Sequence, residues 1–407
     1  MEGETQPPPD SMEGEARPPP ACVSKVLDDD DLLTEIIIRV GFPTSLVRAA
    51  CVCRRWLSHA SDRAFLRRFR ELHPPRLLGF YLAQGYPYDA ARFFPMLPQP
   101  PELAAVIRRT NFSQRPFFSK EEGGTMVGCS NGRVITRRLN FSVLNNCVLA
   151  YELVFAVHNP LCYDYDHGMA ILPGLQLGMP CLYNWAQLFS KEERDGSSYF
   201  YVTVEDTMEP KMNVYMWQAG DDAWHKHLTL GSDRLLHPQS TPKGVLVDNK
   251  IYFAADNAIV ILDLTSSILL TTQLPHGVDF DLGTTMLSRV NDGSGLYLIH
   301  IKELQLHIWL HNGDNWLLVD TICLSETFAG LLEDELTVDI RINHVGDYNG
   351  FVFLEMGRSV LYLDVNRRTL CKAYEMTTEE KCLGDIYPFM MTWPPIFPTL
   401  SPARNAT

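Results

Sequence analysis

The chain has 407 residues, a formal net charge of −14, and a composition of 46% hydrophobic, 11% aromatic and 21% charged residues. This length favours two or three domains with at least one large core, and the composition is that of a globular protein rather than a disordered or fibrous one. The acidic balance disfavours a general binder of nucleic acid or anionic membranes, and no apolar run has the roughly 20 residues that a membrane helix needs.

The N-terminal segment repeats itself almost exactly, as MEGETQPPP followed by MEGEARPPP. Its proline triplets and glutamates bury too little apolar surface to offset the entropy of ordering, so we expect residues 1–23 to be a disordered tail. The segment lacks the apolar stretch of a secretory signal, and the ten cysteines are scattered without a CxxC pair. We therefore expect reduced thiols and a location in the cytoplasm, the nucleus or both.

Residues 24–75 have a helical pattern that predicts three helices. In the first helix, Leu33, Ile36, Ile37 and Val40 fall at i, i+3, i+4 and i+7 behind a run of aspartates that suits a helix N-terminus. The second helix is expected to start after Thr44 or Ser45 and to run to Ala60. The third helix is expected to be capped by Asp62 and to end at His73, Pro74 and Pro75. The predicted core of this domain consists of Ile37, Leu46, Cys53, Trp56, Leu57 and Phe65.

Several apolar residues of the helical segment lie off the predicted core stripes. On the first helix Ile38 is expected to project on the far side, between Thr34 and Glu35. On the second helix Val47, Cys51 and Val52 stand among arginines, and residues 46–70 contain seven arginines. Exposed aliphatics rimmed by arginine are typical of a protein-binding surface, and they favour an acidic partner. An RNA-binding role for the third helix, and a plain helical cap on the following domain, are the alternatives.

Beyond residue 75 the pattern is that of β-strands, with short apolar runs broken by Gly, Asn or Asp. Two kinds of hairpin alternate. VYMWQAGDDAWHKHLTL (214–230) and LHIWLHNGDNWLLVDTICL (306–324) each carry two tryptophans, whereas IYFAADNAIVILDLTSSILL (251–270) and FVFLEMGRSVLYLDVNRRTL (351–370) each contain a Leu-Asp strand end. Alternation with a period of roughly 45 residues predicts the blades of a β-propeller, and a two-sheet sandwich is the alternative.

The helical segment resembles an F-box, the three-helix motif that binds the Skp adaptor of cullin-based ubiquitin ligases. The ordered run from Val52 to Trp56 carries most of the resemblance, although this chain has Leu27-Asp28 where the family usually has Leu-Pro. The remainder is similar to the C-terminal region of plant F-box proteins, grass ones above all, through NGRVI, VHNPL, the hairpins above and the closing IYPFMMTWPP. The resemblance, together with the off-stripe positions of Ile38 and Cys51, leads us to expect adaptor-binding residues at Leu27, Leu32, Leu33, Ile36, Ile38, Val47, Cys51, Val52, Arg54 and Arg55.

The fold predicted from these patterns is a multidomain α+β chain, in which a small three-helix F-box precedes a mostly antiparallel, all-β propeller-like domain. We expect a tail at 1–23, the F-box at 24–75, a linker at 76–100, the propeller-like domain at 101–395 and a second tail at 396–407. The resemblance implies a non-catalytic substrate receptor that contacts a Skp adaptor, through it a cullin, and a target protein of unknown identity. A propeller enzyme or sugar-binding module and a non-degradative F-box scaffold are the alternatives.

The sequence contains no nucleophile elbow, HExxH helix, Walker loop or dinucleotide fingerprint, so we expect no catalytic residue, cofactor or bound metal. Residues 164–168 fail as a calcium loop because Leu175 stands where a bidentate glutamate belongs. His225 and His227 lie two apart on a predicted strand, which favours a solvated face over a metal site. We interpret the paired tryptophans as packing between blades, and Asp263 and Asp364 as turn caps.

Overall fold

The structure is a computed structural model. It describes residues 21–40, 43–73, 75–83, 91–110, 112, 124–130, 132–144, 147–161, 169–177, 186–192, 198–206, 211–231, 243–255, 258–281, 283–290, 295–313, 315–327, 339–346, 350–380 and 382–391. The chain divides into two compact units, one of which contains the N-terminal helices up to Pro75 while the other spans Arg76–Met391. Each unit is described by itself.

The described residues of the N-terminal unit form five short helices. They are α1 (Ala21–Asp28), α2 (Asp30–Ile38), α3 (Pro43–Ala50), α4 (Arg54–Ser61) and α5 (Arg63–Leu72). Asp29 caps α2 by accepting hydrogen bonds from the amides of Asp31 and Leu32, both at 3.0 Å. The predicted cap of the last helix is confirmed, because Asp62 accepts from the Phe65 amide at 2.9 Å.

Two helix boundaries differ from the sequence prediction. Helix α1 begins at Ala21, within the segment expected to be a tail, and the predicted second helix is divided into α3 and α4. The division falls at Cys51, Val52 and Cys53, which all have low helix propensity, and Cys53 has an extended backbone as the residue before α4. The apolar stripe continues across this break, so periodicity alone did not reveal it.

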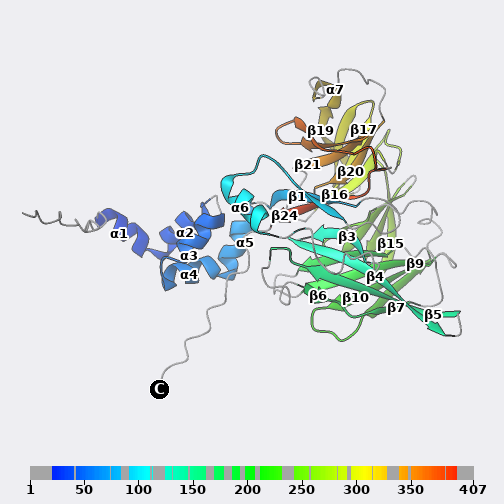
Figure 1. Ribbon diagram of the computed structural model, residues 1–407, viewed down its shortest axis with the longest axis horizontal. Helices are drawn as coiled ribbons and strands as arrows, with labels where there is room; N and C mark the ends of the chain where they lie inside the picture. The colour runs from blue at the N-terminus through cyan, green and yellow to red at the C-terminus, as the bar shows by residue number, and fades with distance from the viewer. Residues whose placement is uncertain are drawn as a thin grey trace, which may run out of the picture. The chain divides into compact units, whose positions relative to one another are not determined.

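The second unit is a six-bladed β-propeller (Figure 1). Blade one contains β3 (Thr125–Ser130), β4 (Arg133–Leu144), β5 (Cys147–His158), β6 (Met169–Ile171) and β7 (Leu175–Leu177). Blade two contains β8 (Ala186–Glu192), β9 (Ser198–Asp206), β10 (Lys211–Gln218) and β11 (His225–Gly231). Blade three contains β12 (Val245–Val247), β13 (Lys250–Ala255), β14 (Ala258–Asp263) and β15 (Ile268–Gln273). All pairings in these sheets are antiparallel.

The remaining blades complete the ring. Blade four contains β16 (Thr285–Arg289), β17 (Leu296–Lys302), β18 (Gln305–Asn312) and β19 (Asn315–Cys323), and blade five contains β20 (Ile340–Val345), β21 (Phe351–Met356), β22 (Ser359–Asp364) and β23 (Thr369–Glu375). The short helix α7 (Leu324–Thr327) follows β19. The innermost strands β3, β8, β12, β16, β20 and β24 (Ile386–Met391) each contact the next, and β24 contacts β3. The described strands thus form a closed ring, which confirms the propeller prediction and excludes the sandwich.

The sixth blade joins distant parts of the chain. β24 pairs with β1 (Arg76–Leu82) from Arg76↔Met391 to Leu82↔Ile386, and β1 pairs with β2 (Arg92–Pro95) on its other side. The prediction of a linker at 76–100 is therefore wrong for both strands, and α6 (Pro101–Arg109) begins directly after that range. The partner of β1 lies about 300 residues away in the sequence, where a local pattern cannot reveal it.

The hydrophobic cores lie between blades, because each sheet packs one face on either neighbour. One cluster combines Phe155 and Val157 of blade one with Val202 of blade two, and equivalent clusters occupy the next three junctions. Blades five and six share a cluster centred on Phe80 and Phe353. At roughly 1.5–3 kcal/mol for each fully buried large side chain, these junctions are the main source of stability.

Candidate adaptor surface and propeller pocket

Most of the predicted adaptor-binding side chains are accessible on the helical unit. Their exposed fractions are 47% for Leu32, 44% for Ile36, 41% for Val47 and 62% for Val52. Cys51 and Arg54 are exposed as well, and Leu27 is half-buried. These residues come from α2, α3, α4 and the α3–α4 connection. We call Leu32, Ile36, Val47, Cys51, Val52 and Arg54 the F-box apolar surface.

Two of the predicted adaptor-binding residues are buried. Leu33 is 0% exposed and Ile38 is 1% exposed, so the expectation that Ile38 projects into solvent is wrong. The physical reason is that α2 contacts both α4 and α5, so more than one stripe of this helix is covered. His73 at the end of α5 also hydrogen-bonds the Ile38 carbonyl, with 2.7 Å between Nε2 and the oxygen.

Arg55 was predicted to meet the adaptor, but its guanidinium is occupied within the helical unit. It donates to the carbonyl oxygens of Leu27 at 2.6 Å and Asp28 at 2.7 Å, and to Asp30 Oδ1 at 2.5 and 2.8 Å. Arg55 therefore fastens the α1–α2 junction to α4. The fork of donors in arginine suits this task, because carbonyls and a carboxylate can be bound together.

Three of the six predicted core residues of the helical unit are buried. Ile37, Leu46 and Phe65 are buried at 1%, 0% and 5% exposure, and Trp56 and Leu57 are half-buried. Cys53 is exposed, contrary to expectation, because the chain leaves the helix there. Sequence reasoning also missed Val23 and Val26 of α1, which are 40% and 38% exposed.

Ion pairs neutralise some of the charged side chains of the helical unit. Arg55 and then His59 hydrogen-bond Asp30 and hold the pKa of its carboxyl below the usual value, and Arg68 does the same for Glu35. Arg48 and Arg54 are exposed and have no ion-pair or hydrogen-bond partner in the part of the chain that the structure describes. Arg54 belongs to the F-box apolar surface, and Arg48 follows its member Val47 in the sequence, so both add positive charge to this region.

The tryptophan pairs of the propeller pack between blades, as predicted. Trp217 and Trp224 pack on the cluster between blades one and two, and Trp309 and Trp316 on the cluster between blades three and four. Trp224 Nε1 also donates to the Pro173 carbonyl of blade one at 2.7 Å. These side chains hold neighbouring blades together, so they do not form a ligand-stacking platform.

The other candidates for chemistry have structural roles. Asp263 accepts from the amides of Thr265 and Ser266, and Asp364 from the Arg367 amide, which confirms both as turn caps. These amide hydrogen bonds, that of Ser266 first, hold the pKa of Asp263 below its usual value.

The two histidines of β11 do not act together. His227 Nε2 hydrogen-bonds the Leu264 carbonyl of blade three at 2.7 Å, and His225 lies near Asp221. Among the described residues no group of three or more His, Cys, Asp or Glu is placed to hold a metal. Residues 164–168 lie outside that part of the chain.

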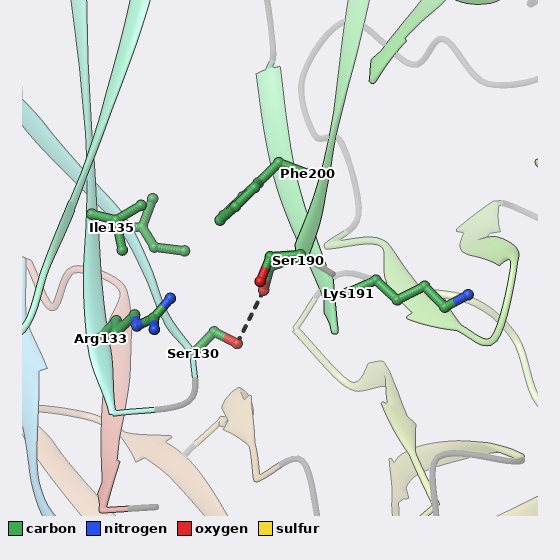
Figure 2. Close-up of a pocket in the computed structure, with 8 residues that line it drawn as sticks. Ser130, Arg133, Ile135, Ser190, Lys191 and Phe200 are labelled. Carbon is green, nitrogen blue, oxygen red and sulfur yellow. Dashed lines mark hydrogen bonds between the residues drawn. The ribbon is translucent and has the colours of Figure 1, made fainter. Parts of the chain in front are cut away.

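A small pocket that the sequence did not indicate lies between blades one and two (Figure 2). Its lining residues are Ser130, Arg133, Ile135 and Val157 from blade one and Ser190, Lys191, Ser198 and Phe200 from blade two. Its polar side chains stand where β3 turns into β4 and where β8 ends and β9 begins. The residues come from five strands of two sheets, so no local sequence pattern could have gathered them.

The fold resembles solved structures only distantly. The chain has a TM-score of 0.35 and 10% identity to a 6-phosphogluconolactonase candidate from Bacteroides uniformis ATCC 8492, covering 77% of this chain and 98% of that one. For the WD40 domain of SCAP from fission yeast, the TM-score is 0.32 and the identity 10%, covering 64% of this chain and 67% of that one. For the polysaccharide lyase Uly1, the TM-score is 0.30 and the identity 9%, covering 59% of this chain and 54% of that one. No curated protein matches the chain.

No described helix is long and apolar enough to cross a membrane. Residues 29–68 match the model of the F-box domain. Residues 125–397, more than half of the chain, match the model described as F-box protein AT5G49610-like, beta-propeller. The chain therefore belongs to the AT5G49610-like family of F-box proteins, in which a short helical F-box is followed by a β-propeller.

Proposed function

We propose that this protein is a substrate receptor of a Skp-cullin-F-box ubiquitin ligase. The helical unit binds a Skp adaptor, the propeller binds a target protein, and other subunits transfer ubiquitin. The combination of an F-box with a propeller supports a substrate-recognition role in general. The cytoplasm and the nucleus are the compartments that we propose for it.

The observation that carries the proposal is the F-box apolar surface. Four aliphatic side chains that are at least 41% exposed, on a unit of some 50 residues, are unfavourable unless a partner covers them. Arg48 and Arg54 add unpaired donors for the carboxylates of an acidic partner. Leu33 and Ile38 are buried and are therefore not proposed as contacts.

The test is a binding titration of the full chain against a plant Skp adaptor. We expect Val52→Asp to weaken binding at least tenfold, because a buried, unpaired carboxylate at an interface costs more than about 1.4 kcal/mol. Ile171→Asp is the matched control, since Ile171 is 58% exposed on blade one and outside the proposed surface. Trp56→Ala should weaken binding through the packing of α4.

Two outcomes would reject the proposal. In the first, the folded wild-type chain shows no binding to the adaptor. In the second, Val52→Asp binds as tightly as the wild type. Equal weakening by Ile171→Asp would indicate an electrostatic effect of the whole chain in place of a local contact.

A further inference from the structure

The pocket between blades one and two combines a polar end with apolar walls. Ser130 and Arg133 come from the β3–β4 hairpin, and Ser190 comes from the end of β8. Ile135, Val157 and Phe200 supply the walls, and the space, including its open mouth, is roughly 320 Å³. Most of this space is open to solvent, and only about 20 Å³ of it can take the centre of a water-sized group, so the pocket holds one small polar group such as the oxygens of an anion.

Arg133 is the unusual member of the pocket. Its guanidinium has no hydrogen-bond or ion-pair partner among the residues that the structure describes, although the residue is only half-exposed. Figure 2 shows its nitrogens on the side that faces Ser190. A partly desolvated guanidinium without a partner is unfavourable, and an anion in the pocket would satisfy it through a charge-assisted hydrogen bond.

The serine hydroxyls can take part in the same contact. Ser130 Oγ and Ser190 Oγ are 3.4 Å apart, a long hydrogen bond that is readily exchanged for a bond to a ligand oxygen. Ser198 adds a third hydroxyl to the lining. Hydroxyls and a guanidinium on one side of a pocket match an acceptor-only group, which is the chemistry of a carboxylate or phosphate.

Lys191 contributes charge to the pocket without pointing into it. Its Nζ donates to Asn249 Oδ1 of blade three at 2.6 Å, and Figure 2 shows the side chain extending away from Arg133 and the serines. The local charge of the pocket is therefore positive on a chain whose net charge is −14. Arg133 is the cation placed for direct contact.

We propose that this pocket binds a single oxyanion, a carboxylate or a phosphate, carried on a short apolar stem. Arg133 and the serines hold the oxygens, and Ile135, Val157 and Phe200 form the apolar wall that the stem lies against. That the stem belongs to a target protein, as an acidic or phosphorylated side chain, rests on the proposed function. The inference then assigns target contact to the end of the propeller where the inner strand turns into the second strand.

The experiment uses the full chain and ligand-detected NMR with butyrate, propyl phosphate and, as a neutral probe, 1-butanol. We expect at least one anion to bind saturably with a dissociation constant below ~10 mM, which is typical of such small fragments. No binding of 1-butanol is expected. The anion that binds more tightly, butyrate or propyl phosphate, shows whether the pocket prefers a carboxylate or a phosphate. Inorganic phosphate, which lacks a stem, should bind more weakly than propyl phosphate.

Variants separate the pocket from the general charge of the chain. Arg133→Gln should weaken anion binding about tenfold, and Ser190→Ala about threefold, as expected for one charge-assisted and one neutral hydrogen bond. Arg108→Gln is the control, because Arg108 is exposed on α6 and has no partner among the described residues. Melting temperatures verify that each variant is folded.

The inference is overturned if neither anion binds the wild type, or if folded Arg133→Gln and Ser190→Ala bind the anions as the wild type does. The same variants are titrated with the Skp adaptor. Adaptor binding that persists while anion binding is absent rejects the pocket alone. Anion binding without adaptor binding rejects the proposed function and supports the pocket.

Discussion

Trp309 and Trp316 of blade four differ in their hydrogen bonding although both pack between blades three and four. Trp316 Nε1 donates to the Gln273 carbonyl at the end of β15, with a distance of 2.8 Å. Trp309 Nε1 is buried and has no hydrogen-bond partner among the described residues. The spacing of the tryptophans predicted that they pack between blades, but it carried no information about this difference.

Replacing each tryptophan by phenylalanine compares the two environments. We expect Trp316→Phe to lower the free energy of unfolding by about 1 kcal/mol beyond the loss of ring area, because a hydrogen bond between blades is removed. Trp309→Phe removes a polar group that is already unpaired, so it should cost less. Chemical denaturation of both variants measures the difference, and equal costs would contradict the assignment.

His300 is a titratable group almost fully enclosed in blade four. It is 6% exposed and contacts Thr285 Oγ1 through Nδ1 at 3.0 Å. Burial, followed by the neighbouring His307 and Lys302, lowers the pKa of His300 below 6.5, while Asp279 acts in the opposite direction. The folded chain thus binds a proton at this position less readily than the unfolded chain does.

This shift predicts a pH dependence of stability. The contribution of a neutral His300 is complete above about pH 6.5 and is lost as the pH falls through its folded pKa, because only the unfolded state gains the proton readily. The melting temperature should fall by a few degrees between pH 7.5 and 5.5, and His300→Gln should reduce this fall. His225→Gln, at a 64% exposed side chain, is the control and should leave most of the dependence unchanged.

At the scale of elements, strands were easier to predict than their partners. Hairpins such as β13–β14 and β21–β22 are continuous in sequence, and the alternating pattern identified them. The break between α3 and α4 and the incorporation of β1 and β2 into the sixth blade were not predicted. Both depend on contacts that the local sequence does not contain.

Gly384 permits the close approach of two segments of the sixth blade, the one that follows β1 and the one that precedes β24. A Cβ at this position would overlap the Ala83 carbonyl oxygen, and the Ala83 amide bonds the Asp385 carbonyl at 3.0 Å. We expect Gly384→Ala to destabilise the propeller by at least ~2 kcal/mol, because backbone must move. Gly128→Ala in β3 is the matched control, since a Cβ there meets open space. A melting temperature for Gly384→Ala equal to that of the control would contradict this explanation.

For the whole molecule, the order of an F-box and a propeller followed from the sequence, whereas the number of blades and the closure did not. The repeats are degenerate, and one blade has three strands from two ends of the fold. The candidate site was predictable in part. Val47 and Val52 are exposed as expected, but Leu33 and Ile38 are buried and Arg55 is occupied, because the packing of α2 against two helices is a tertiary effect.

Closure of the ring predicts that stability depends on the last strand. A chain ending at Asp385 lacks β24, which exposes the edge of β1 and uncovers Phe80 and Phe353. We expect this truncated chain to lose the cooperative unfolding transition of the propeller and to bind a dye for exposed apolar surface. A chain ending at Met391 should keep the cooperative transition and should not bind the dye. A cooperative transition in the shorter chain would show that the ring closes by other contacts.

The pairing of β1 with β24 also orders events during protein synthesis. A ribosome releases the helical unit and β1 first, while the strand that completes the sixth blade is made some 300 residues later. During that interval the propeller is an open arc with an unpaired edge, whereas the F-box is already complete. Nascent chains whose translation stops early would therefore carry a complete F-box without a closed propeller, and their exposed edge would be a binding site for chaperones.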